Sequence, residues 1–306
     1  MRMTLHFLNV GNGDCTIIEL PDGNLMMVDI CNGGGTNPQL TDPINYLYDL
    51  QSKRSLFLQF ISPIAYICAL LSKPRLFNYV QTHPDMDHMD GLAALVQKCN
   101  IIDFWDTDNN KPRPNFSSPH SKGKPADWDA YQRLRQKAKR YYRSLSPVTL
   151  QGGQRYPYDL YVLHPTRQAV AHANRSGDWN HAAYVLLLKF ASFKALIAGD
   201  VDDDVWEELY NWASRNNIAR DLVSNITVFK VSHHGRRSGY CGRNWLNLTN
   251  PQEIVISKGS VPGEHSAYGN YYNYKNGAEH LWLTSKGDVI CNYNLHKNEY
   301  SIDYRR

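Results

Sequence analysis

One run of seven residues, Thr82–His88, constrains this chain more than any other feature. It contains four side chains that can bind a metal: His83, Asp85, Asp87 and His88. The run follows the apolar segment Leu76–Gln81, which predicts a strand, and precedes Leu92–Lys98, which predicts a helix. Alternate residues of a short extended turn point the same way, so the first three side chains can converge. Imidazole and carboxylate suit Zn²⁺ or Mn²⁺, and the run therefore predicts a metal-binding loop. A polar loop with local turn bonds is the alternative.

Further ionisable groups follow two predicted strands in the second half of the chain. Asp200 comes after the apolar strand Lys194–Ala198 and a glycine, and His233 and His234 come after the strand Thr227–Val231. Alone, the aspartate could cap a helix and either histidine could be a packed, hydrogen-bonded residue. Taken with the first run, they make a set large enough for two divalent metal ions that share a bridging carboxylate.

The distribution of apolar segments predicts an α/β protein. Strands are predicted at Leu5–Val10, Cys15–Leu20, Leu25–Ile30, Leu76–Gln81, Ile101–Trp105, Tyr158–Leu163, Tyr184–Phe190, Lys194–Ala198, Thr227–Val231, Glu253–Ser257, Leu281–Thr284, Asp288–Tyr293 and Tyr300–Tyr304. Helices are predicted at 42–72, Leu92–Lys98, Ala130–Tyr142 and Asp202–Asn216. Because strands and helices alternate in both halves, two sheets are expected. The glycine patterns of P-loop and dinucleotide-binding proteins are absent from the sequence.

Composition excludes several other classes. With 306 residues, 42% of them hydrophobic and 20% charged, the chain can bury a sizeable core, and collagen-like, coiled-coil and wholly disordered structures are excluded. The six cysteines form no CxxC pair, which favours free buried thiols in a reducing compartment, and a cytoplasmic location is expected. The most apolar stretch, Phe57–Leu71, contains Pro63 and is shorter than a membrane span. It predicts a buried or interface helix, with a membrane-surface or dimer contact as the alternative, and no stable membrane insertion.

Positive charge is concentrated in one segment. The net charge of the chain is +4, but residues 111–143 carry ten lysines and arginines against two aspartates, so the segment alone is at +8 and the remainder at −4. A charge run of this kind is often a solvated helix face. The alternative is a surface that binds a polyanion such as nucleic acid.

The order of these motifs resembles the metallo-β-lactamase superfamily. In this chain, the motifs are, in order, Asp29 after a strand, the HxDxDH run at 83–88, Gly199-Asp200 and His233-His234-Gly235. The family usually reads HxHxDH, and here Asp85 replaces the second histidine. That replacement, the turn Val10-Gly11-Asn12-Gly13-Asp14, and Asn180 are most similar to the soluble hydrolase domain of ComEC-like competence proteins. The resemblance implies a four-layer αββα sandwich over residues 1–306, a single domain with a basic insert at about 106–150.

The resemblance also implies metal-binding roles. His83 and Asp85 would hold one ion, Asp87 and His88 would hold a second, and Asp200 would bridge the two. The last ligand would be His233 or His234, with His233 favoured. Asn180 or His181 stands where the family usually has another histidine, at a position that would contact substrate or metal. Asp29 would orient a ligand from behind.

A metal-dependent hydrolase is the implied function. A metal-activated water would attack the substrate, and Asp87 would orient it. His265 is a candidate proton donor, and Lys258 lies in a late loop that the family brings to the site. The leading substrate is a phosphodiester of nucleic acid, DNA above all. Alternatives are a hydrolase of small molecules such as a lactone, thioester or cyclic nucleotide, and a binding protein with a vestigial metal site.

Overall fold

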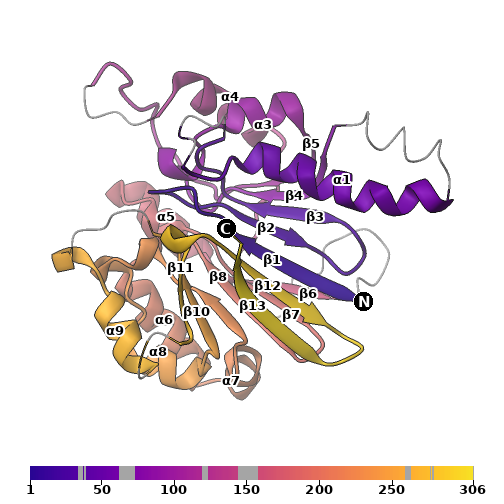
Figure 1. The fold of residues 1–306 in the computed structure, drawn as a ribbon. Helices are drawn as coiled ribbons and strands as arrows, with labels where there is room; N and C mark the ends of the chain where they lie inside the picture. The colour runs from indigo at the N-terminus through magenta and orange to yellow at the C-terminus, as the bar shows by residue number, and fades with distance from the viewer. Residues whose placement is uncertain are drawn as a thin grey trace.

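Two mixed sheets form the centre of the molecule (Figure 1). The computed structural model describes residues 1–33, 37, 39–61, 73–118, 123–143, 158–258, 263–275, 277 and 279–305, with only the helical course for 54–61. The strands of the first sheet are β1 (Arg2–Phe7), β2 (Thr16–Glu19), β3 (Leu25–Val28), β4 (Arg75–Val80), β5 (Asn100–Trp105), β12 (Asp288–Asn294) and β13 (Glu299–Arg305). Those of the second are β6 (Asp159–His164), β7 (Val185–Phe190), β8 (Phe193–Ala198), β9 (Val228–Lys230), β10 (Glu253–Ile256) and β11 (Leu281–Leu283).

Each sheet combines an antiparallel part and a parallel part. The first sheet has the order β13-β12-β1-β2-β3-β4-β5, in which β3, β4 and β5 are parallel. The second has the order β11-β10-β9-β8-β7-β6, in which β8, β9, β10 and β11 are parallel. Parallel neighbours end at the same edge of a sheet, so β3 and β4 end together, as do β8 and β9.

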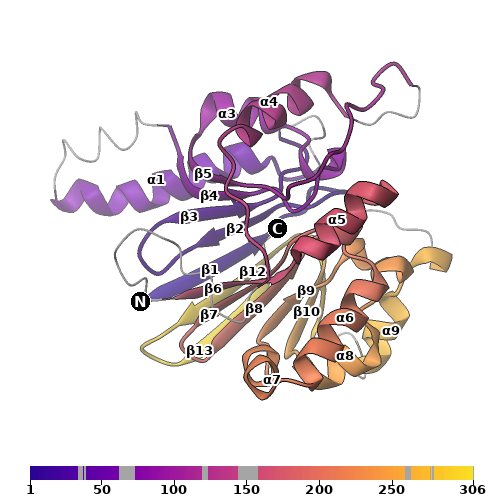
Figure 2. The same ribbon diagram turned by 180° about the vertical axis from the view of Figure 1, so that it is seen from behind.

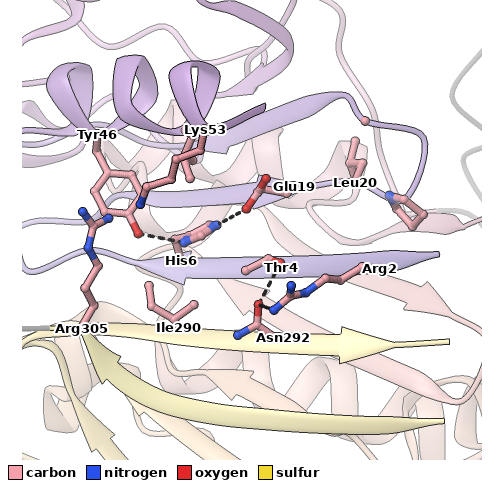
Figure 3. A pocket seen from close by; sticks show the side chains of 13 residues that line it. Arg2, Thr4, His6, Glu19, Leu20, Tyr46, Lys53, Ile290, Asn292 and Arg305 are labelled. Atoms are coloured by element: carbon pink, nitrogen blue, oxygen red, sulfur yellow. Dashed lines mark hydrogen bonds and ion pairs between the residues drawn. The ribbon is translucent and has the colours of Figure 1, made fainter. Parts of the chain in front are cut away.

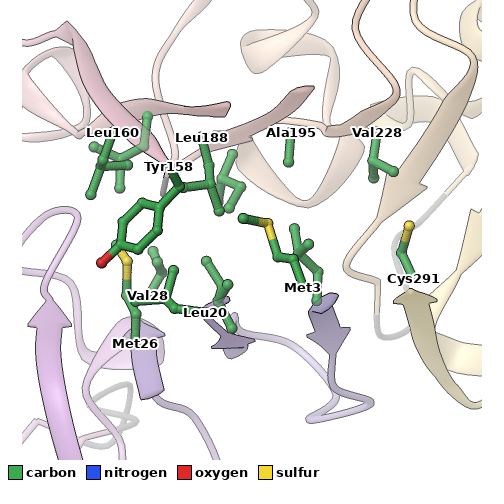
Figure 4. Packing of buried hydrophobic residues seen from close by; sticks show 14 of the residues in the cluster. Met3, Leu20, Met26, Val28, Tyr158, Leu160, Leu188, Ala195, Val228 and Cys291 are labelled. Atoms are coloured by element: carbon green, nitrogen blue, oxygen red, sulfur yellow. The ribbon is translucent and has the colours of Figure 1, made fainter. Parts of the chain in front are cut away.

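Side-chain alternation along the strands fills three separate layers of core. On β7, Leu186 and Leu188 point between the two sheets, whereas Val185 and Leu187 point to helices on the other face. Because both faces are buried, this strand is apolar at nearly every position. Figure 4 shows the layer between the sheets, where Met3 and Val28 of the first sheet face Leu188 of the second.

Helices cover the outer face of each sheet, as both views show (Figures 1 and 2). The first sheet carries α1 (Pro43–Ile61), α3 (Leu92–Lys98) and α4 (Pro125–Arg135), and the second carries α6 (Asp203–Ser214), α7 (Asn217–Val223), α8 (Gly242–Thr249) and α9 (Tyr268–Tyr274). A further helix, α5 (Arg167–Ser176), packs against Ala182 and Tyr142. The predicted four-layer αββα sandwich is confirmed.

The predicted strands all have counterparts, but the helix predictions need correction. The helix predicted at Ala130–Tyr142 is α4, which begins at Pro125 and ends at Arg135. Proline is preorganised for the first helical turn, which explains the earlier start. The chain then leaves the helix because Lys139 pairs with Trp105 beside β5. The prediction for Phe57–Leu71 falls largely outside the described residues, and α5, α7, α8 and α9 are additional to the predicted helices.

Two further expectations concern the thiols and the membrane. The five cysteines within the described residues are free and buried: Cys15, Cys31, Cys99, Cys241 and Cys291. Among the described helices, none has the length and apolar character needed to cross a bilayer.

Candidate metal centre

The ionisable groups gather where the two sheets meet. The loop after β4 is joined to the second sheet because the amide of Tyr184 donates to the carbonyl of Thr82 at 3.0 Å. The loop after β8 passes equally close, since a Cβ built on Gly199 would lie 2.7 Å from the Thr82 side chain. Only glycine fits this approach, which places the next residue, Asp200, opposite the Thr82–His88 run.

His88 is the most firmly held member of the group. It lies in the short helix η1 (Met86–His88), is fully buried, and its Nδ1 is 2.7 Å from Oδ2 of Asp29. The same aspartate accepts hydrogen bonds from the amide and hydroxyl of Thr82 at 2.7 and 2.6 Å. A proton on Nδ1 is therefore fixed, and Nε2 points at Asp200, whose Oδ2 lies 3.2 Å away. Asp29 therefore contacts the ring nitrogen of His88 that is turned away from Asp200, and its role in orienting a metal ligand stays a prediction.

Charge around His88 overrides its burial. Burial lowers the pKa of His88, but the carboxylates of Asp200 and Asp29 outweigh it and raise the pKa well above its ordinary value. The pKa of Asp200 is shifted in the opposite direction. Burial would raise it, but His234 and His88 outweigh burial and hold it well below its ordinary value. The pocket therefore favours a positive charge between these groups, whether a proton or a metal ion supplies it.

His83 lies beside His88, and its Nε2 makes no hydrogen bond within the part of the chain that the structure describes. It is fully buried, its ring centre is 4.1 Å from that of His88, and its Nδ1 is 3.1 Å from the hydroxyl of Thr82. Burial, followed by the charge of His88, lowers the pKa of His83 below its ordinary value. A neutral imidazole is the form that binds metals.

His234, rather than the favoured His233, reaches into the cluster. Its Nε2 lies 3.3 Å from Oδ2 of Asp200 and 3.6 Å from Oδ2 of Asp87. Both histidines follow β9 in the turn η3 (His233–Gly235) and adopt positive φ angles of 50° and 52°. Such backbone is costly for residues other than glycine and is typical of functional sites. His233 lies farther out, with Nε2 4.0 Å from Asp200 and Nδ1 3.1 Å from the hydroxyl of Ser238.

Two buried residues of the cluster were not among the predicted ligands. Asp14, in the turn between β1 and β2, has Oδ1 3.7 Å from Nδ1 of His234, and its other oxygen contacts the ammonium of Lys230. Lys230 also donates to the carbonyl of Ala198 at 2.7 Å. Burial would raise the pKa of Asp14, but Lys230 and His234 hold it below its ordinary value. The sequence contains a signal for each of these residues. Asp14 is a charged residue in the turn after a strand, and Lys230 is a single lysine in an otherwise apolar strand.

The donor set fits a divalent metal ion. Among the described residues, four groups of three have ligand atoms within 4.8 Å of one another: His83, His88 and Asp200; Asp87, His88 and His234; Asp14, Asp29 and His88; Asp14, Asp200 and His234. Several of these atoms are buried without a hydrogen-bond partner in the part of the chain that the structure describes: Nε2 of His83, Nε2 of His88, both ring nitrogens of His234, Oδ1 of Asp14 and Oδ1 of Asp200. Buried polar atoms normally have hydrogen-bond partners, so this concentration marks a site that could hold a cation.

Asp85 and the residues near Asn180 do not join these groups. One oxygen of Asp85 contacts the ammonium of Lys111, and the other is 3.9 Å from Nε2 of His83. His181 lies in η2 (Asn180–Ala182), and its Nδ1 is 3.3 Å from Asp204 instead of any cluster residue. Asn180 begins the same short helix, where its carbonyl accepts a hydrogen bond from the amide of Ala183 at 2.9 Å.

Among the described residues, the late-loop candidates His265 and Lys258 are not part of the ligand groups. His265 has a side chain that is 71% exposed, and its Nε2 is 3.5 Å from its neighbour Glu264. Its loop is attached to the site because the amide of Ala267 donates to the carbonyl of Gly235 at 2.8 Å. Lys258 lies over the ring of Tyr268 at 5.6 Å. Their predicted roles remain predictions.

The basic insert is largely neutralised. Seven of its basic side chains form ion pairs: Lys111 with Asp85, Arg113 with Asp129, Lys124 with Asp90, Arg135 with Asp106, Lys139 with Asp103, Arg140 with Asp108, and Arg143 with Glu208. Most of these acids lie outside the charge run in sequence, so counting charges within the run overstated its positive field. The pairing does not support the expected nucleic-acid surface.

A separate cavity of about 790 Å³ lies on the outer face of the first sheet (Figure 3). Lys53 and Tyr46 reach it from α1, and Arg305 reaches it from β13. At its floor, His6 lies 3.0 Å from Oε1 of Glu19 and 2.9 Å from the hydroxyl of Tyr46. None of the cluster residues lines this cavity.

Comparisons with known proteins give distant structural likeness alone. No protein-family model and no curated protein matches the chain. Two structures of CmlA, a diiron β-hydroxylase from Streptomyces venezuelae, one of them a point mutant, match with a TM-score of 0.48 and 12% or 11% identity. They cover 91% of this chain, which spans about half (52%) of theirs. A protein provisionally named a metal-dependent hydrolase, from Parabacteroides distasonis, matches with a TM-score of 0.46, 10% identity, and coverage of 91% and 92%.

Proposed function

We propose that this chain is a metal-dependent hydrolase. The observation that carries the proposal is a group of buried ring nitrogens and carboxylate oxygens that lie close together where the two sheets meet and make no hydrogen bond within the described residues. Asp87, His88 and His234 would hold a divalent ion, with Asp200, Asp14 and His83 around them. An ion bound there lowers the pKa of water and stabilises negative charge that develops on oxygen. Zn²⁺ and Mn²⁺ both suit these ligands.

Asp87 is the residue proposed to handle the attacking water. Its side chain is 42% exposed, unlike the other carboxylates of the cluster, and its Oδ2 lies 3.6 Å from Nε2 of His234. Partial burial would raise the pKa of Asp87, but His234 and His88 keep it below its ordinary value. An ionised carboxylate at the mouth of the site can accept a hydrogen bond from water and orient it.

The proposed substrate is a phosphodiester, with nucleic acid as the first candidate. The motif set supports this choice, because it resembles ComEC-like hydrolases. A second candidate is a small molecule such as a cyclic nucleotide, lactone or thioester. The ion pairs of the basic insert favour this second candidate. Because seven cations of the insert are paired with carboxylates, the insert has a weaker positive potential with which to attract a long polyanion.

Hydrolysis assays distinguish these candidates. The metal-free protein is reconstituted with Zn²⁺ or Mn²⁺ and given single- and double-stranded DNA, RNA, a cyclic nucleotide, a lactone and a thioester. We expect turnover of a phosphodiester that disappears with chelator and in Asp87→Asn. Asp129→Asn, a change at a half-exposed aspartate that pairs with Arg113 and belongs to none of the ligand groups, is the matched control and should keep full activity. Turnover that survives both chelator and Asp87→Asn would contradict the proposal.

A further inference from the structure

The position expected to hold a second ion is short of ligands. One group of three does include His83, together with His88 and Asp200. Because Nδ1 of His88 is held by Asp29, its Nε2 can bind only one ion, the ion shared with His234. His83 and Asp85 are therefore the ligands specific to the second position. Within the described residues, no group of three that could hold a metal includes Asp85. Its Oδ2 lies 3.9 Å from Nε2 of His83, and its Oδ1 is in contact with Lys111.

Lys111 is held in place by the basic insert. Its ammonium lies 5.0 Å from the centre of the Trp179 ring, and its side chain is only 18% exposed. The amide of the preceding residue, Asn110, donates to the side chain of Asn174 at 2.8 Å, and the indole of Trp179 donates to Asn110 at 3.3 Å. These contacts fix the backbone before Lys111 and the position of its side chain. Little additional side-chain entropy is therefore lost when its ammonium stays at Asp85.

We propose that Lys111 takes the place of the second divalent ion, so that the centre binds one metal ion and one fixed ammonium. The ammonium neutralises Asp85, the carboxylate that such an ion would need. It would also repel a divalent ion at His83, because charges of like sign a few ångströms apart in a partly buried site interact strongly. The proposal rests on the proposed metal centre and deepens it: the second positive charge facing substrate comes from the chain itself.

Metal stoichiometry tests this inference directly. The purified protein is stripped with chelator and titrated with Zn²⁺ or Mn²⁺ by calorimetry, and bound metal is measured after dialysis. For the unaltered chain we expect one tightly bound ion, with any second ion at least about 100-fold weaker. Lys111→Met should bind two ions, and Mn²⁺ paramagnetic resonance should change from an isolated-ion spectrum to that of a coupled pair.

Matched variants separate the role of Lys111 from general effects of the insert. Lys124→Met removes another cation of the same insert, one that pairs with Asp90 at 3.1 Å, and should still bind one ion. Lys111→Arg keeps the charge and should also bind one ion. Lys111→Met combined with Asp85→Asn should return the count from two to one. Thermal melting of each variant establishes that it is folded.

Three outcomes would overturn the inference. Two tightly bound ions in the unaltered chain would show that Lys111 only orients Asp85. One ion in both the unaltered chain and Lys111→Met would show that the ammonium does not exclude the second. No bound ion in any folded variant would instead refute the metal centre, and with it the proposed function, so the two failures are distinguishable.

Discussion

The metal centre and the basic insert both contain many ionisable side chains. They differ in how deeply those side chains are buried and in whether each one has a partner of opposite charge. In the insert, cations meet carboxylates singly and mostly near solvent, as Lys139 meets Asp103 at 2.5 Å with the lysine 44% exposed. In the centre, most side chains are buried, and several of their polar atoms make no hydrogen bond within the described residues, as with Nε2 of His83.

This difference distinguishes exposed charges, which mainly keep the protein soluble, from buried charges that serve a function. An exposed ion pair changes stability little, because water already solvates both partners. A buried polar atom without a partner is costly, so the fold must retain it for another reason. The centre is therefore the region where substitutions should affect function, and the insert should be mainly structural, with Lys111 as the proposed exception.

Asp200→Asn should break the centre most severely. Asp200 faces both His88 and His234, at 3.2 and 3.3 Å, so its charge holds the cluster together. We expect metal binding to be lost and hydrolysis to fall by about 1000-fold or more, because a bound ion contributes several kcal/mol to the transition state. Calorimetric titration with Zn²⁺ and initial rates on a phosphodiester measure the two effects. Retained metal binding would contradict the assignment.

Arg135→Met should produce the largest loss of stability within the insert. Its partner, Asp106, is fully buried, with Nε of Arg135 2.7 Å from Oδ2. Removing the cation leaves a buried carboxylate uncompensated, which we expect to lower the free energy of unfolding by about 3 kcal/mol at pH 8. Urea titration measures the loss.

The same variant should have a characteristic pH dependence. Burial raises the pKa of Asp106 to about 6, although the charge of Arg135 opposes the rise. Between about pH 4 and pH 6 the folded state therefore binds the proton more tightly than the unfolded state, so this contribution to stability is greatest in acid and falls as the pH rises. Without Arg135 the pKa rises further, and the deficit of Arg135→Met should shrink at pH 5. A deficit that is equal at pH 5 and pH 8 would contradict the charge-based explanation.

Asp29→Asn should weaken the centre without destroying it. The carboxylate does not have to contact the ion, since it fixes Nδ1 of His88 at 2.7 Å and is itself held by Thr82. Loss of such an orienting partner commonly costs 10- to 100-fold in metal affinity, and about that loss in Zn²⁺ affinity is expected here. Asp22→Asn, in the exposed turn between β2 and β3, is the control and should bind normally. Unchanged affinity in Asp29→Asn would show that His88 is oriented by packing alone.

Much of the fold could be predicted because local pattern and tertiary packing agree. The strand β7 is apolar on both faces, and it lies between two layers of core. Helix boundaries were less predictable. The helix α4 was expected to extend to Tyr142, but it ends at Arg135, since the following residues pair alongside β5. Tertiary pairing of this kind leaves no local signal.

The site was predictable as a set of loops and less so as individual contacts. Residues after strand ends could be grouped, because parallel strands end at one edge. Which of two adjacent histidines turns inward depends on a strained turn, and the structure brings His234 closer than His233. The insert was misjudged for a related reason. The partners of Lys124 and Lys139, Asp90 and Asp103, lie before the charge run in sequence.

Lys139→Met should have the smallest effect on stability of the four substitutions, because it removes an exposed ion pair of the insert. Its ammonium pairs with Asp103, and both groups are in contact with solvent. We expect the free energy of unfolding to fall by less than about 1 kcal/mol, because solvent screens an exposed pair and holding two long side chains together costs entropy. Urea titration of Lys139→Met, Asp103→Asn and the double variant gives the coupling between them. A coupling above about 2 kcal/mol would contradict the distinction, since exposed pairs of the insert would then stabilise the fold as strongly as buried ones.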